Sequence, residues 1–267
     1  MSTHDRQSHL TVAFTRGQSR ITSWRSVNPL RLLNPRHDGL CHVMVSSYGG
    51  GLVQGDDVSL DVRCEQSAAL LLSGQSHGRA YRCTQEDATV SWQTTGTVAE
   101  GATVISQMPP LVLHSATRAA QRQSWQVHPE GRLLLIETVH AGRLGSGEAF
   151  AFDRFESHVE IQRGATQVVW DPQALPADTP RAFRFPVLQT IYAIGWPDSL
   201  QETLATEIKR VGGTPPSGRV AEMPEVLAAS FDLPAGGFIG RLVANSAKPA
   251  EEIAEALAQA SKELVPA

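Results

Sequence analysis

One five-residue stretch of the sequence has the residue types and spacing for nucleophilic chemistry. The letters GQSHG at residues 74–78 fit the G-x-S-x-G pattern, in which a tight turn presents a serine nucleophile. That chemistry requires a strand before the serine and a helix after it, because the helix N-terminus helps to stabilise an oxyanion. Residues 68–73 predict the strand, but residues 79–93 have no helical stripe and continue into a β pattern. We therefore expect Ser76 in a turn and no catalytic residue, with a serine esterase-type hydrolase as the alternative.

A glycine-rich stretch at residues 48–57 is the second candidate, because such loops can cradle a phosphate. It lacks the Gly-Lys-Ser/Thr ending of a P-loop, and no helix is predicted to follow it. The glycines are better explained by a tight turn or a close approach of two backbone segments. Asp56 closes this turn and could point into an internal cavity. Glu148 opens a strand after a similar turn, where Arg143 or Arg82 could pair with it.

Metal ligands are not grouped along the chain. The histidines are scattered, and the one adjacent pair, Cys41-His42, would face apart in a strand. Cys41, Cys64 and Cys83 are an odd number without C-x-x-C spacing, so we expect reduced thiols, with Cys64 in the core. Stable zinc or nickel sites usually use two or three His or Cys at helical or hairpin spacing. We therefore expect no stable metal site and no tightly bound cofactor.

The composition is typical of a soluble globular protein. The 267 residues suffice for one large domain or two small ones. The 23 basic and 27 acidic residues give a net charge of −4 without a dense Lys/Arg cluster, which argues against a nucleic-acid partner. The N-terminus is polar, and no run of about 18 apolar residues occurs, so we expect no membrane segment and a cytoplasmic protein.

The elements that must position these residues are mostly strands. Period-2 alternation dominates to about residue 170, as in 58–64 and 150–170, and glycine-containing turns recur about every ten residues. We expect a mainly β protein, with many short strands in a layered or superhelical body over residues 1–172.

The pattern changes after Pro172. The proline-rich residues 171–186 are expected to be a connector or an edge. Two amphipathic patterns then predict helices near 198–211 and 249–264. We expect residues 173–267 to continue the same domain.

Four motifs follow one another along the chain: Pro29-Leu30-Arg31, Gly50-Gly51 with Gly55-Asp56, Gln75 with Tyr81-Arg82, and Gly142-Arg143 with Gly147-Glu148. In this order and spacing they resemble the urease accessory protein family UreD, also called UreH. The resemblance covers most of residues 10–172 and, more loosely, the C-terminal helix, and Arg79 stands where the family usually has Lys.

The resemblance implies a non-enzymatic maturation chaperone with a largely β fold. Such a protein would bind the urease apoprotein and the accessory protein UreF, and through UreF the GTPase UreG, in a hetero-oligomer that delivers nickel. Carboxylates hold nickel more loosely than imidazole or thiolate clusters, so they could line a passage for a transient hydrated ion. We expect the passage or partner contacts to use Asp56, Gln75, Tyr81, Arg82, Arg143 and Glu148.

A β-sandwich binding module, for carbohydrate for instance, is the third hypothesis. It would use some of Trp24, Trp92, Trp125, Trp170 and Trp196 as stacking platforms. Exposure of three of these rings on one face would favour it.

Overall fold

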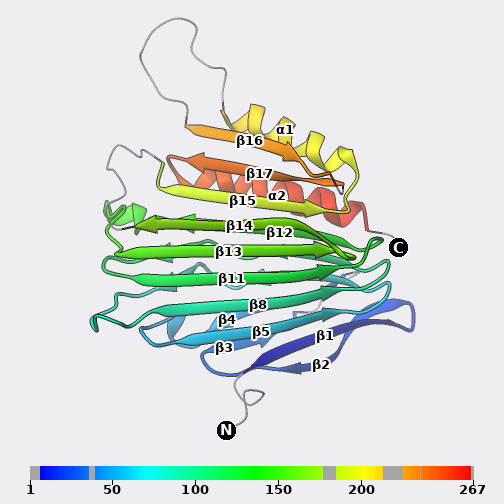
Figure 1. The fold of residues 1–267 in the computed structure, drawn as a ribbon, viewed down its shortest axis with the longest axis horizontal. Coiled ribbons are helices and arrows are strands. Elements are labelled where there is room, and N and C mark those ends of the chain that lie inside the picture. Colours follow the sequence, from blue (N-terminus) through cyan, green and yellow to red (C-terminus); the bar gives the residue numbers. More distant parts are fainter. Residues whose placement is uncertain (1–6, 36–39, 177–184, 213–224, 235, 266–267) are drawn as a thin grey trace, which may run out of the picture.

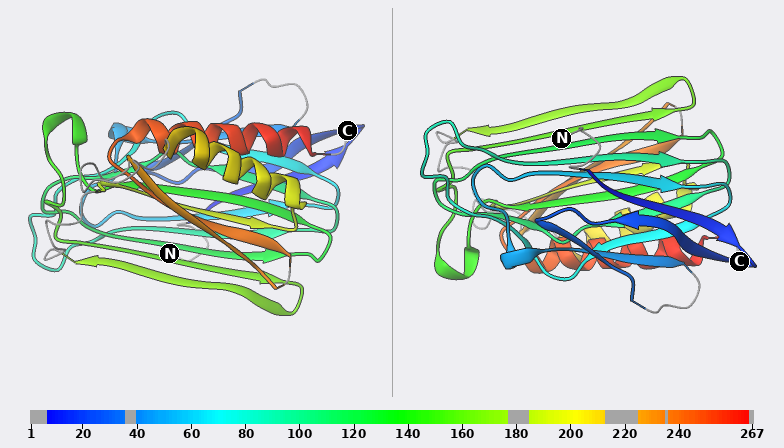
Figure 2. Two further views of the ribbon diagram at one scale, coloured as in Figure 1. Left: turned by 90° about the horizontal axis from the view of Figure 1, so that it is seen from above. Right: turned by 90° about the horizontal axis from the view of Figure 1, so that it is seen from below.

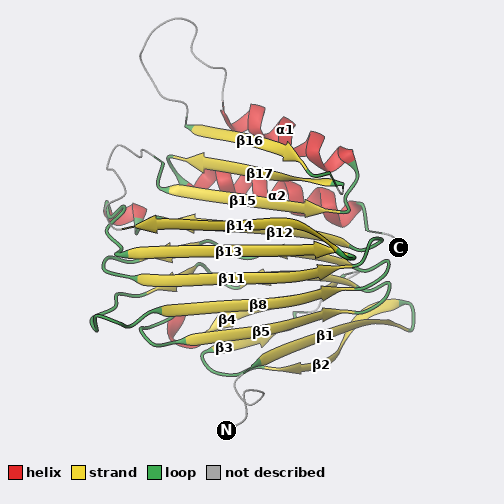
Figure 3. Ribbon diagram, viewed as in Figure 1, coloured by secondary structure: helices red, strands yellow, loops and turns green. Residues whose placement is uncertain are grey.

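The protein consists of two stacked β-sheets with two helices against one of them (Figures 1 and 3). The mainly β prediction is confirmed, and so are the two helices in the C-terminal part. The computed structural model describes residues 7–35, 40–176, 185–212, 225–234 and 236–265.

Sheet A has seven strands in the order β14-β13-β11-β8-β5-β1-β2. Its inner residues alternate with polar outer ones, as in β13, where Phe155, Val159 and Ile161 are buried. This is the period-2 pattern of the sequence. The strands are β1 Ser8–Thr15, β2 Gln18–Arg25, β5 Asp57–Cys64, β8 Val90–Val98, β11 Arg118–Val127, β13 Arg154–Arg163 and β14 Thr166–Pro176.

Sheet B has ten strands, of which eight lie in the order β16-β17-β15-β12-β9-β6-β4-β3, while β10 pairs with β12 and β7. The strands are β3 Leu30–Leu33, β4 Cys41–Ser47, β6 Ala69–Gly74, β7 Gly78–Ala80, β9 Thr103–Gln107, β10 Leu111–Leu113, β12 Arg132–His140, β15 Val187–Ile194, β16 Val226–Asp232 and β17 Gly237–Ala244.

The central strands of sheet B are buried on both faces, which explains their continuous apolar runs. In β12, Leu133 and Leu135 belong to the core between the sheets, whereas Leu134 and Ile136 belong to a second core under the helices. Helices α1 (Asp198–Gly212) and α2 (Ala247–Glu263) lie side by side and cover that second core (Figure 2). In α2 the stripe facing the sheet includes Ile253 and Leu257.

The chain winds between the two sheets as a coil. In sheet A, β5, β8, β11 and β13 are mutually parallel, and in sheet B the same holds for β4, β6, β9 and β12. Short turns join β5 to β6, β8 to β9 and β11 to β12 at one end. The longer returns from sheet B to sheet A lie at the opposite end, on the left of Figure 1.

The C-terminal part differs from expectation in its strands. Sequence patterns indicate only helices after residue 186, but β15, β16 and β17 extend sheet B. The proline-rich segment, expected to be a connector or an edge, begins as an edge: β14 runs to Pro176 as the edge strand of sheet A, where a proline is tolerated because its missing N–H would face no further strand. The rest of that segment to residue 184 lies outside the described residues.

Candidate functional site

The four long returns form one end of the molecule, which we call the connection end. It comprises residues 48–56, 75–89, 108–117 and 141–153, including the short helices η2 (Tyr48–Gly50) and η3 (Leu144–Ser146). Because the strands of sheet B that precede the returns are parallel, their carboxyl ends meet at this edge. All six residues predicted for the passage or for partner contacts lie here: Asp56, Gln75, Tyr81, Arg82, Arg143 and Glu148.

The glycine-rich loop packs its backbone directly on the strand-like segment around β7. The Leu52 N–H donates to the Arg79 carbonyl oxygen at 2.7 Å, and the Tyr81 N–H donates to the Leu52 carbonyl oxygen at 2.9 Å. A Cβ atom at Gly51 would lie 2.6 Å from the Tyr81 ring and 2.8 Å from the Arg79 carbonyl oxygen. Glycine is therefore required by close approach of two backbones. Strand β5, and no helix, follows the loop, so it has no phosphate-binding helix N-terminus.

Arg143 and Glu148 form the charged centre of the connection end. The Arg143 Nη2 donates to Glu148 Oε2 at 2.6 Å, and the Ser115 N–H donates to Glu148 Oε1 at 3.1 Å. The hydrogen bond from Arg143 holds the pKa of Glu148 below its ordinary value. The ring of His114 stands edge-on to Tyr81, with centroids 4.9 Å apart. Burial and the nearby Arg143 charge lower the pKa of His114. Three of the six predicted residues therefore lie together: Arg143 and Glu148 form an ion pair, and Tyr81 lies beside them through its contact with His114.

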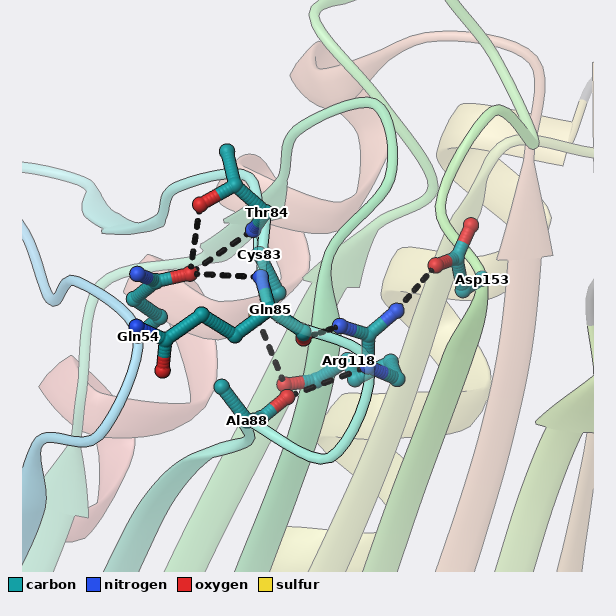
Figure 4. Close-up of polar contacts among 7 residues, drawn as sticks. All are labelled: Gln54, Cys83, Thr84, Gln85, Ala88, Arg118 and Asp153. Carbon is teal, nitrogen blue, oxygen red and sulfur yellow. Dashed lines mark hydrogen bonds and ion pairs between the residues drawn. The ribbon is translucent and has the colours of Figure 1, made fainter.

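A second network fixes the loop that carries Arg82 (Figure 4). Gln54 Oε1 accepts hydrogen bonds from the Thr84 N–H at 2.7 Å and from the Gln85 N–H at 3.2 Å. From the other side, Arg118 donates to the Ala88 carbonyl oxygen at 3.0 Å, to the Gln85 carbonyl oxygen, and to Asp153 at 2.6 Å. The loop is therefore held between the glycine-rich loop and the first residues of sheet A strands.

The other three predicted residues lie outside the Arg143–Glu148 centre. Asp56 Oδ2 accepts the Val53 N–H at 2.8 Å and so closes its own turn, and it lines neither cavity described below. Gln75 is exposed, and its Oε1 accepts the Ser46 hydroxyl at 3.0 Å. Arg82 is exposed, and its guanidinium has no polar partner among the residues that the structure describes.

A cavity of about 110 Å³ opens between the sheets behind the connection end, and a buried acid lines it. Glu137 on β12 accepts hydrogen bonds from the side-chain amides of Gln123, at 2.6 Å, and Gln121, and a longer one from the Ser157 hydroxyl. All three donors are neutral. Burial raises the pKa of Glu137 above its ordinary value. Sequence reasoning missed Glu137 because it lies in an apolar run. A lone acid in such a run is nevertheless informative, since acidic residues are rarely buried without hydrogen-bond or charge partners.

Ser76 does not occupy a nucleophile elbow. It lies in the turn between β6 and β7, and the residues after it form a short strand instead of the helix that an oxyanion site requires. The expected turn is confirmed, and the hydrolase alternative loses its structural basis.

The tryptophans do not form a stacking platform either. Trp125 and Trp196 are buried, and Trp92 is half-buried. The exposed rings, Trp24 and Trp170, lie on β2 and β14, at opposite edges of sheet A. Three exposed rings on one face are therefore not found.

Within the described ranges, no group of three His, Cys, Asp or Glu side chains is arranged to hold a metal ion. Cys64 is in the core as expected, and Cys41 and Cys83 are also buried and free. None of the described helices is long and apolar enough to cross a membrane.

Comparison with known proteins agrees with the family resemblance seen in the sequence motifs. The family model for the UreD urease accessory protein matches residues 6–266. A urease accessory protein UreD from Sorangium cellulosum is 32% identical over 243 residues, which cover 88% of this chain and 74% of the relative. UreD proteins from Cytophaga hutchinsonii and Anaeromyxobacter sp. are 33% and 34% identical, over 61% and 69% of this chain. The matches span 56% and 63% of the length of those two relatives.

Proposed function

The chain belongs to the UreD urease accessory protein family, and from this membership we propose that it is a non-catalytic scaffold for urease maturation. It binds the urease apoprotein and a UreF-type accessory protein, which recruits the GTPase UreG, and it assists nickel delivery within that complex. The family match over nearly the whole chain carries the proposal. The turn at Ser76, which lacks the following helix, supports a role without covalent chemistry.

The connection end is the surface that we assign to partner binding. Its loops are ordered by two hydrogen-bond networks, so little conformational entropy is lost when a partner binds. Arg82 projects from one of these loops with an exposed and unpaired guanidinium, as far as the described residues show. An unpaired guanidinium on a rigid loop is well suited to a carboxylate on a partner.

The nickel ion is cargo in this proposal, and Glu137 is the better oxygen ligand for it inside the protein. Glu148 is already bound by Arg143, so an ion would compete there with a guanidinium. Glu137 faces a cavity and is contacted by neutral donors only. A hydrated ion could therefore approach Glu137 without displacing a cation. Asp56 is bound within its own turn and contributes less.

The scaffold function is tested by co-expressing the tagged chain with urease subunits and a UreF-type protein. We expect both partners to be retained on affinity purification, and Arg82→Glu to reduce retention about tenfold or more through charge reversal. Arg122→Glu is the matched control, because Arg122 is also exposed but lies within β11, away from the connection end. Absence of both partners from the purified wild-type complex would reject the proposal.

Nickel delivery is tested separately by the nickel content of urease purified from those cells. We expect Glu137→Gln to lower the nickel content, because the amide cannot bind a cation as a carboxylate does. Glu160→Gln makes the same change on the outer face of sheet A and should leave the nickel content unchanged. Equal nickel content in both variants would remove Glu137 from the proposal without affecting partner binding.

A further inference from the structure

A second cavity lies under the first turns of α2, and the proposed function does not use it. This α2 pocket has a volume of about 320 Å³ and lies between α2, the turn at residues 74–78 and the Pro109-Pro110 segment. The residues that matter for its chemistry are His77, Pro109, Pro110, Gln189, Glu251 and Glu255.

Gln189 gives the pocket a buried hydrogen-bond acceptor that has no donor. Its side chain is only 2% exposed, and its Nε2 donates to Thr138 Oγ1 and to the Ala250 carbonyl oxygen, both at 2.9 Å. A carbonyl oxygen can only accept, so the bond to Ala250 fixes which end of the amide is nitrogen. The remaining Oε1 has no hydrogen-bond partner among the described residues. A buried acceptor left in this state is costly, so it indicates a missing donor.

The charge of the pocket indicates what kind of donor is missing. Glu251 and Glu255 are one helical turn apart, so both line the same side. Glu251 lies 3.5 Å from His77 Nε2, while Glu255 has no polar partner in the part of the chain that the structure describes. None of the described lining residues is Lys or Arg. The ligand should therefore be a cation with several N–H donors.

We propose that the α2 pocket binds a guanidinium group. Its planar fork of five N–H donors can reach two carboxylates and a carbonyl oxygen together, which the compact ammonium group of lysine cannot do as well. The rings of Pro109 and Pro110 line the pocket as well and offer an apolar wall for the guanidinium face. A metal ion fits less well, because the described residues hold no set of three metal-binding side chains.

The test uses the full-length chain alone, so its outcome does not depend on the urease proposal. Binding of two probes is measured by NMR and calorimetry: methylguanidinium, and an arginine flanked by two glycines on each side in a capped peptide. We expect saturable binding that shifts the His77 ring signals, because the probe competes with His77 for Glu251. Glu255→Gln should weaken binding about tenfold or more, the effect of losing a charged hydrogen bond.

Glu263→Gln is the matched control, since it removes the same charge near the other end of α2. It should leave the affinity unchanged, and thermal melting of both variants checks that they fold. Tighter binding of the peptide identifies a partner's arginine as the source, and tighter binding of methylguanidinium identifies a free compound. Failure of both probes to saturate, or equal weakening by Glu255→Gln and Glu263→Gln, would overturn the proposal. So would saturable binding of Ni²⁺ in the pocket without binding of either probe.

Discussion

His114 is the residue that reports on the charges of the connection end. The Arg143 charge lowers its pKa and the Glu148 charge raises it, in addition to the larger lowering by burial. We therefore expect Arg143→Met to raise the pKa of His114 and Glu148→Gln to lower it further. NMR titration of the His114 ring measures both shifts. Shifts in the same direction, or none, would mean that the two side chains do not face His114 in solution.

Glu137 should make the stability of the protein depend on pH. Its pKa is raised in the folded state, so the folded protein holds the proton more tightly than the unfolded chain does. As the pH rises above the ordinary glutamate value of 4.5, the free energy of unfolding should fall until the folded pKa is passed. Glu137→Gln should abolish this fall. Urea unfolding of both proteins at a series of pH values measures it, and a constant difference between them would contradict the expected burial.

The sequence predicts which residues of the connection end lie in turns better than it predicts which side chains contact one another there. Turn chemistry identifies both Asp56 and Glu148, and the sequence offers Arg143 and Arg82 as partners of Glu148, of which the structure shows Arg143. The partnership of Tyr81 with His114 could not be predicted, because it joins two returns and depends on the parallel order of the strands. In the sequence, Glu137 is only one position of a predicted strand. Its importance depends on the cavity that it lines, which the sequence pattern does not show.

At the scale of elements, Gly96 in β8 is a point where packing permits no side chain. Gly96 is directly beside Trp125 of β11, and an added Cβ would lie 2.1 Å from the indole ring. Trp125 is completely buried, so it cannot move into solvent. We expect Gly96→Ala to destabilise the protein by about 1–3 kcal/mol through overpacking.

The matched control for Gly96→Ala is Gly145→Ala, because a Cβ at Gly145 meets no atom within 4 Å. Chemical denaturation compares the two variants with the wild type. Equal stability of the two variants would show that β8 and β11 are not packed as described.

Strands that are buried on one face are the elements that sequence patterns predict best. Sheet A shows period-2 alternation because one face contacts the core and the other contacts water. The same logic fails for β15, which is buried on both faces because α2 covers the face of sheet B that would otherwise be exposed. A short run buried on both faces has no period-2 pattern, so periodicity alone cannot tell whether it is a strand or a helix. The answer depends on which elements pack on it, and a local sequence pattern does not identify them.

At the scale of the whole molecule, β12 joins the two cores. Leu134 and Leu135 are both fully buried, one under the helices and one between the sheets. Leu134→Ala and Leu135→Ala should each cost about 2–5 kcal/mol. Because one strand carries both cores, each variant should lower the unfolding midpoint of both layers equally. Hydrogen exchange in peptides from β11 and from α2 across a urea series tests this, and an effect confined to one layer would indicate two separate folding units.

The coiled path of the chain between the sheets bears on synthesis at the ribosome. Each new turn of the coil pairs with the turn made just before it, so an emerging polypeptide can add turns in order from the N-terminus. The outer face of sheet B receives its cover only when α2, which follows all of these strands in the chain, has emerged. Until then, Leu71, Ile105 and Leu134 present a bare apolar surface that cellular holdases can recognise.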